Sequence, residues 1–208
     1  MKINCTILIL AVFLAVGCST SYTSTYWKSE NKPAQKIERI LVVGVSANEK
    51  NRSLVEREMS YVLNLEKMKA APSVSYVNAQ QRKPTKEEIL PLIDSLNVHA
   101  VMTMELKEVK EGEARFELQS GSSYYGPEHP DFYNYLDGFR DSQQGYFTAE
   151  QYMIIETNLY DASNGKVIFS AISETFAPNA ETLEPLVEDF VESVAKKLKK
   201  SRLVVLQK

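Results

Sequence analysis

A buried strand followed by an amphipathic helix is the feature that most limits the folds open to this chain of 208 residues. The run Ile37 to Val45, IERILVVGV, is β-branched and apolar and ends in a polar turn, which predicts a central strand. Serine and glutamate then stand three apart in Ser53 to Glu56, the pattern of a capping box. Apolar residues follow on one helical face: Val55, Met59, Val62 and Leu63. A strand followed directly by a helix favours an α/β fold.

Strand and helix patterns alternate again in the middle of the chain. Val74 to Val77 is a short strand candidate. A second capping box, Thr85 to Glu88, predicts a helix that Pro91 should kink or shorten. Val98 to Val109 and Ala114 to Gln119 alternate between apolar and polar residues, so both are predicted to be strands.

The C-terminal third predicts a hairpin and a long helix. Tyr152 to Tyr160 and Val167 to Phe176 flank Asn164-Gly165, which suits a tight turn. An apolar stripe from Leu183 to Leu198 predicts a helix with acids at its start and lysines at its end, as the helix dipole favours. A last short strand is expected at Leu203 to Leu206. The expected fold class is α/β, a mixed β-sheet packed by helices in the order β-α-β-α-β-β, long loop, β-β-α-β.

The N-terminus has the features of an export signal. Lys2 precedes an apolar run, Ile3 to Val16, that matches the hydrophobic region of a signal peptide and is short for a transmembrane helix. The run ends in Gly17-Cys18, which resembles the lipobox of bacterial lipoproteins, although the family more often has leucine at the position of Ala15. The resemblance implies cleavage before Cys18 and acylation of its thiol, with palmitate among the acyl groups. An ordinary secretory signal that is cut elsewhere is the alternative.

This resemblance sets the expected domain boundaries and the expected location. Residues 1–17 form the signal peptide, residues 18–36 the lipidated cysteine with a flexible tether, and residues 37–208 a single α/β domain. Cleavage also removes Cys5, so the mature chain has no second cysteine for a disulfide. Ser19 stands where an aspartate commonly retains lipoproteins in the inner membrane. The family analogy therefore implies an outer-membrane lipoprotein, most simply one that faces the periplasm of the cell envelope.

The domain itself resembles a group of small bacterial envelope lipoproteins. The resemblance rests on ILVVGV, on Val-His-Ala-Val-Met after a helix, and on LYDASNGKVIFS, Leu159 to Ser170, before a long final helix. It implies the fold of the curli-secretion channel lipoprotein, the penicillin-binding-protein activator lipoprotein and the amino-terminal domain of the Tol-system periplasmic protein. Members of this group bind partners or form assemblies and share no catalytic residues, so the resemblance implies fold more than activity.

The search for catalytic or metal-binding patterns returns mainly structural interpretations. The sequence has two histidines: His99 at the start of a strand and His129 between Glu128 and Asp131. A metal site in that second group is conceivable, but chance proximity in a loop is favoured. Carboxylate pairs such as Glu105 with Glu108, or Glu156 with Asp161, are interpreted as surface residues on strands. No phosphate-binding loop or nucleophile elbow is present. We therefore expect no enzyme activity, no cofactor and no metal.

An aromatic-rich insertion at residues 121–150 is the unusual feature of the domain. Thirty residues are long for a connection in a compact domain, and tyrosine is enriched at interfaces. The predicted partner-binding residues are Tyr124, Tyr125, Phe132, Tyr133 and Tyr135. The opposing interpretation is that these aromatics fold back on the edge of their own sheet. The two interpretations are left open.

The balanced charge of the chain argues against nucleic acid as a partner. The 24 basic and 27 acidic residues are interleaved, with no basic stripe for nucleic acid. The lysines that end the last helix, residues 196–200, are interpreted as a solvated helix end and not as a membrane-binding patch. The function favoured is a lipid-anchored, non-enzymatic interaction or regulatory module with an envelope protein or itself as partner. A subunit of a ring-forming secretion or envelope assembly is the alternative, and an envelope hydrolase is disfavoured.

Overall fold

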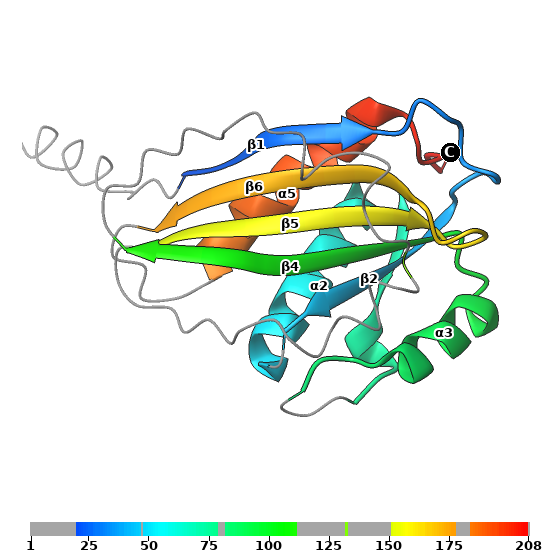
Figure 1. The fold of residues 1–208 in the computed structure, drawn as a ribbon, viewed down its shortest axis with the longest axis horizontal. Helices are drawn as coiled ribbons and strands as arrows, with labels where there is room; N and C mark the ends of the chain where they lie inside the picture. Colours follow the sequence, from blue (N-terminus) through cyan, green and yellow to red (C-terminus); the bar gives the residue numbers. More distant parts are fainter. Residues whose placement is uncertain are drawn as a thin grey trace, which may run out of the picture.

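A mixed β-sheet packed by helices forms the domain, as the sequence predicts, and the described residues give it six strands. The computed structural model describes residues 20–46, 48–78, 82–111, 132, 151–177 and 184–207. Within them the strand order is β1-β6-β5-β4-β2-β3, and three α-helices pack against the sheet (Figure 1). The α/β class is therefore confirmed.

One half of the sheet is parallel and is built by two crossovers. β2 (Arg39–Val45) lies between β3 (Lys69–Pro72) and β4 (Ala100–Glu111) and is parallel to both. α2 (Glu49–Leu65) connects β2 to β3, and α3 (Lys86–Ser95) connects β3 to β4 across the sheet. Because the two crossovers run in opposite directions, right-handed connections place α2 and α3 on opposite faces of the sheet.

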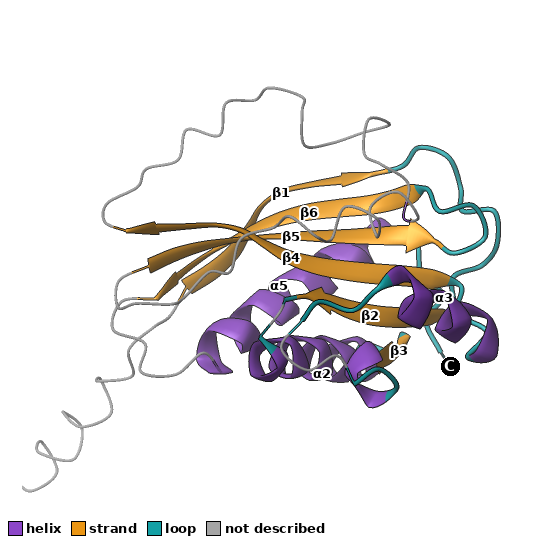
Figure 2. Ribbon diagram, turned by 60° about the horizontal axis from the view of Figure 1, so that its bottom comes forward, coloured by secondary structure: helices purple, strands orange, loops and turns teal. Residues whose placement is uncertain are grey.

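The other half of the sheet is antiparallel. β5 (Gln151–Asp161) pairs with β4 on one side and with β6 (Val167–Ala177) on the other. The predicted hairpin between them is confirmed, and Gly165 has φ 70°, a conformation that glycine adopts without strain. α5 (Glu184–Ser201) then runs back across the sheet beside α2 (Figure 2).

Each face of the sheet has its own hydrophobic core. Ile40 and Val42 of β2 point to the face that α2 and α5 cover, while Leu41 and Val43 point to the face of α3. This alternation follows from the two-residue period of a strand. Both sets of side chains are at most 2% exposed. The predicted central strand is thus correct, with buried residues on both faces.

Part of the segment predicted to be a flexible tether, residues 18–36, is a strand. Residues Thr20–Lys28 form β1, which pairs antiparallel with β6 as an edge strand, from Thr20 opposite Phe176 to Lys28 opposite Phe169. Six of the nine residues are threonine, tyrosine or tryptophan, which have high β-propensity. The strand has a polar composition because it lies at an edge, and this concealed it from a search for apolar periodicity.

The start of α2 also differs from the prediction. The helix begins at Glu49, and the N-cap is Asn48, whose Oδ1 accepts a hydrogen bond from the Asn51 N–H at 3.1 Å. Ser53 and Glu56 are therefore inside the helix, and the capping box predicted for them is absent. The second capping box is confirmed: α3 follows Thr85.

Several shorter predictions need adjustment. The strand expected at Val74 to Val77 lies earlier, as β3, and a 3-10 turn, η1 (Ser73–Ser75), follows it. β4 extends to Glu111, two residues past the end predicted for it at Val109. The strand predicted at Leu203 to Leu206 is reduced to one parallel bridge between Val204 and Ile37. The strand predicted at Ala114 to Gln119 is outside the described residues.

Candidate functional site

Most of the predicted site residues are outside the described part of the chain. This is so for Cys18 and for the metal candidates Glu128, His129 and Asp131. It is also so for the predicted contact residues other than Phe132: Tyr124, Tyr125, Tyr133 and Tyr135. Their predicted roles therefore stay predictions. The described residues show what the rest of the domain can do.

Phe132 packs against its own domain. Its side chain is 0% exposed, and its ring lies 5.4 Å from the ring of Tyr160, centroid to centroid. Its backbone N–H donates to the Gly165 carbonyl at 2.7 Å, at the turn of the β5–β6 hairpin. A side chain without exposed surface offers nothing to a partner, so the contact role predicted for Phe132 does not hold in this structure. At this residue the fold-back interpretation is the better one.

The sheet face on the α3 side carries a buried polar layer along β4, β5 and β6. Its acidic members are Glu105, Glu156 and Glu174, each at most 8% exposed. Thr103, Asn158 and Ser170 share the face and are equally buried. The sequence predicted that such carboxylates would be surface residues on strands. This is wrong for Glu105 and Glu156, and also for Asp161 at the end of β5, which is 0% exposed. All three glutamates take part in polar or electrostatic interactions.

Two of these carboxylates lie directly opposite each other. Glu105 on β4 is in register with Glu156 on β5, an arrangement in which like charges repel. Asn158 offsets part of this cost because its Nδ2 donates to Glu156 Oε1 at 2.8 Å. Burial, followed by the charge of Glu156, raises the pKa of the nearby Tyr160 hydroxyl, so it stays protonated. The layer is a packed part of the sheet, without the exposure that an acid–base pair needs to reach a substrate.

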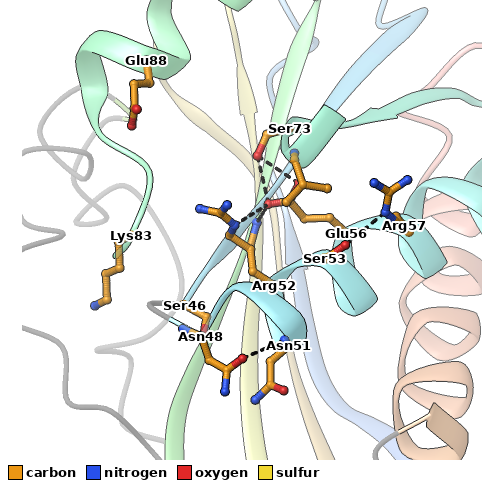
Figure 3. A network of polar contacts seen from close by, with 12 residues as sticks. Ser46, Asn48, Asn51, Arg52, Ser53, Glu56, Arg57, Ser73, Lys83 and Glu88 are labelled. Carbon is orange, nitrogen blue, oxygen red and sulfur yellow. Dashed lines mark hydrogen bonds and ion pairs between the residues drawn. The ribbon is translucent and has the colours of Figure 1, made fainter. Parts of the chain in front are cut away.

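A second buried polar group, the Glu56 centre, joins α2 to β2 and η1 (Figure 3). The Glu56 carboxylate is completely buried. It accepts hydrogen bonds from the Gly44 N–H at 2.9 Å, the Ser73 hydroxyl at 2.9 Å and the Val74 N–H at 2.7 Å. Burial raises the pKa of Glu56, and the hydrogen bonds and the charge of Arg52 oppose that rise. Glu56 thereby satisfies backbone groups at the ends of two neighbouring strands.

Arg52 interacts with Glu56 more weakly than Gly44, Ser73 and Val74 do. Its Nε lies 4.0 Å from Glu56 Oε1, one turn along the helix. The side chain is 1% exposed, and neither Nε nor Nη1 has a hydrogen-bond partner among the described residues. Gly44 leaves room for it, since a Cβ on that residue would lie 3.0 Å from Arg52 Cγ. A side chain at residue 44 would therefore need Arg52 to shift, because the helix approaches β2 closely here.

The Glu56 centre was not predicted, although the sequence contains a pattern that indicates it. Arg52 and Glu56 share a helix face with Met59 and Leu63, which lie in the core. A charged pair at i and i+4 on the apolar face of a helix indicates a buried pair. Ser73 could not be recognised, because its position depends on the turn after β3.

The other candidate groups for chemistry fix the backbone. His99 Nδ1 accepts from the Glu38 N–H at 3.1 Å. Asp161 Oδ1 accepts from the N–H and hydroxyl of Ser163, and Oδ2 accepts from the Ala34 N–H at 2.8 Å. The structural interpretation of His99 is therefore supported. Asp161 holds the hairpin turn and ties the segment after β1 to it.

The N-terminal segment belongs to the domain along its described length. After β1, the Ser29 N–H donates to the Ile168 carbonyl at 2.9 Å, and Ile37 bridges to Val204. On the α5 side, the Tyr26 ring stacks on Phe169 with 6.1 Å between centroids, and Lys197 Nζ lies 5.4 Å from the centre of the Tyr26 ring. Contacts of β1 and of the residues that follow it therefore hold this segment in place.

The lysines of the α5 C-terminus have partners within the domain. Lys196 pairs with Glu192 at 3.2 Å, and Lys199 pairs with Glu66 at the end of α2. Together with the contact between Lys197 and Tyr26, these pairs favour the interpretation of a solvated helix end.

In the described ranges, no group of three or more histidine, cysteine or acidic residues is placed to hold a metal ion. None of the helices described is long and apolar enough to cross a bilayer.

Comparison with known proteins gives similarity in fold alone. No family model matches the sequence, and no curated protein matches it. Similar solved structures include a variant PelC dodecamer from Paraburkholderia phytofirmans, at 13% identity and TM-score 0.49, covering 91% of this chain and 100% of that one. A second PelC dodecamer from that organism has 15% identity and TM-score 0.47, covering 84% and 96%.

The lipoprotein GNA1162 from Neisseria meningitidis is also similar, at 13% identity and TM-score 0.41, covering 78% of this chain and 98% of that one. At these identities and scores the likeness concerns the general course of the chain and carries nothing about activity, assembly or location. The resemblance to the curli, penicillin-binding-protein activator and Tol proteins stays a prediction.

Proposed function

We propose that this protein is a lipid-anchored lipoprotein of the bacterial envelope whose single α/β domain is a non-enzymatic interaction or regulatory module. The observation that carries the proposal is that the folded domain begins directly after Cys18. The lipobox-like sequence ends at Cys18, and β1 starts at Thr20. A secretory signal cut further along the chain would remove residues that pair with β6. Cleavage before Cys18 keeps the sheet whole.

The proposed location is the outer membrane, with the domain facing the periplasm. It rests on the sequence, since Ser19 replaces the aspartate that commonly retains lipoproteins in the inner membrane. Palmitate is proposed among the acyl groups on Cys18. Membrane fractionation of the wild-type protein and of Cys18→Ser, with mass measurement of the mature N-terminus, tests the anchor. Recovery of an unmodified, water-soluble wild-type protein would contradict it.

The non-enzymatic part of the proposal is supported by the use that the fold makes of its polar groups. Glu56 and Asp161 each bind backbone N–H groups of neighbouring segments. His99 accepts a backbone hydrogen bond, and Glu156 is buried against Asn158. A general acid or base must reach a substrate proton within hydrogen-bond distance. These four side chains are committed to the structure of the domain.

The proposed partner-binding residues are four tyrosines in the first half of the insertion: Tyr124, Tyr125, Tyr133 and Tyr135. Phe132 docks on the hairpin and so holds that point of the insertion against the sheet. A photoreactive residue at position 133, with Phe132 replaced by the same residue as a buried control, tests this role in intact cells. Crosslinks to one envelope protein from position 133 alone would support the module.

Two other outcomes would change the proposal. Crosslinks between copies of the chain would favour the ring-forming assembly, and sedimentation of the purified lipoprotein would then give a defined oligomer. An absence of crosslinks from position 133 while the wild-type protein is membrane-bound would remove the insertion from the binding surface.

A further inference from the structure

The short distance between the predicted anchor and β1 fixes how the domain meets the membrane. This inference rests on the proposed acylation of Cys18. One residue, Ser19, separates Cys18 from Thr20, the first residue of β1. Two residue steps span at most about 7 Å. The polar headgroup layer of one leaflet is roughly 5–8 Å thick. Thr20 therefore lies at the outer boundary of the headgroups.

Thr20 is at one end of the sheet, and other strands end there too. Thr20 is in register with Phe176, Phe176 with Tyr152, and Tyr152 with Lys110. We call these four residues the proximal row. Neighbouring strands lie about 4.8 Å apart, so three steps place Lys110 about 15 Å from Thr20. The row crosses β1, β6, β5 and β4 at one level.

The β5–β6 turn lies at the opposite end of these strands. β5 runs from Gln151 to Asp161, and eleven residues at about 3.4 Å each span about 35 Å. Figure 1 shows the arrowheads of β4 and β6 at the end where β1 starts, and the hairpin turn at the other end. The C-terminal end of α5, with its lysines, lies on the hairpin side. The lysines are thus at the end away from the anchor.

The attachment of β1 to the domain is firm. β1 pairs with β6 at eight positions and stacks Tyr26 on Phe169. Asp161 then holds Ala34 at the hairpin. Because one residue separates Cys18 from β1, the position of the anchor constrains the position of the sheet.

We propose that the domain stands on the bilayer with the proximal row at the phospholipid headgroups and the β5–β6 hairpin turn about 35 Å into the aqueous compartment. The partner of the proximal end is therefore the lipid surface itself. The hairpin end, which includes the exposed Lys166, is the part that faces soluble or distant partners.

Two lysines provide a matched test. Lys110→Cys places a fluorescent label in the proximal row, and Lys166→Cys places one on the hairpin turn, with the same loss of charge. The acylated protein is reconstituted in phosphatidylethanolamine and phosphatidylglycerol vesicles that contain a headgroup-attached quencher. We expect the label at position 110 to lose most of its fluorescence and the label at 166 to keep it. Gln151→Cys is a second proximal site.

A spacer variant makes the test specific to the short connection. Twenty Gly-Ser residues inserted between Ser19 and Thr20 have a span of about 25 Å. We expect this insertion to remove most of the difference between the two labels. Equal quenching at 110 and 166 in the protein without the spacer would overturn the proposed orientation. A mature protein without acyl groups would overturn the anchor and with it this inference, and mass measurement distinguishes the two failures.

Discussion

Removal of the Glu56 carboxylate should destabilise the protein far more than removal of its charged neighbour. In Glu56→Ala, the N–H groups of Gly44 and Val74 and the hydroxyl of Ser73 lose an acceptor in a buried site. Hydrogen bonds to a charged group contribute about 1.5–3 kcal/mol each, and they are not additive. Arg52 would also be left as a buried charge. We expect a loss of about 4 kcal/mol in the free energy of unfolding, within the 3–5 kcal/mol typical of a broken buried pair.

Arg52→Met is the matched variant. Methionine keeps most of the apolar stem beside Gly44, and the guanidinium is 4.0 Å from Glu56 with two nitrogens that lack hydrogen-bond partners among the described residues. The desolvation cost of the charge offsets its attraction to Glu56. Because Glu56 keeps its three hydrogen bonds in this variant, we expect Arg52→Met to lose clearly less stability than Glu56→Ala.

Urea unfolding at pH 7, followed by circular dichroism, gives both free energies. A loss in Arg52→Met equal to that in Glu56→Ala would show that the ion pair, and not the hydrogen bonds to the backbone, stabilises this part of the domain. The double variant Arg52→Met/Glu56→Ala should lose about as much as Glu56→Ala alone, or somewhat less, because the uncompensated arginine is gone. A double variant as stable as the wild type would contradict the assignment of the cost to the three orphaned donors.

Three further predictions follow from the structure. Gly44→Ala should lower the urea midpoint, because the new Cβ would lie 3.0 Å from Arg52 Cγ. The same substitution should lower the midpoint less when it is made in Arg52→Ala than when it is made in the wild type, because Cγ is then absent. The hydrogen bond from Arg82 lowers the pKa of Glu88 to about 2, so its contribution is present above pH 4.5 and lost as the pH falls toward 2; Glu88→Gln should flatten that part of the stability curve. Amides of residues 20–28 that pair with β6 should exchange hydrogen slowly, whereas a tether would exchange at once.

The sequence predicted the elements whose apolar residues repeat regularly. The run from Ile37 to Val45, the stripe of α5 and the β5–β6 hairpin were all placed correctly, because burial imposes a period of 2 or 3.6 on their residues. The capping box at Thr85 was also correct, since its signal is local. Fold class follows from the order of such elements, so it could be predicted.

Elements whose position depends on distant residues could not be predicted in this way. β1 has a polar edge-strand composition, and its partner is β6, about 150 residues later in the chain. Ser53 and Glu56 fit the pattern of a capping box, yet Asn48 caps the helix. Glu56 instead accepts a hydrogen bond from the Gly44 N–H. The choice between these arrangements is made by tertiary contacts, which a local pattern does not contain.

The late pairing of β1 also orders the events that the proposed anchor requires. β1 emerges first, but β6 becomes available only after residue 177, and closing so long a loop makes this pairing slow. Only Cys18 and Ser19 separate the predicted cut site from Thr20, the first residue of β1. We therefore expect the proposed cleavage to precede the docking of β1 on β6.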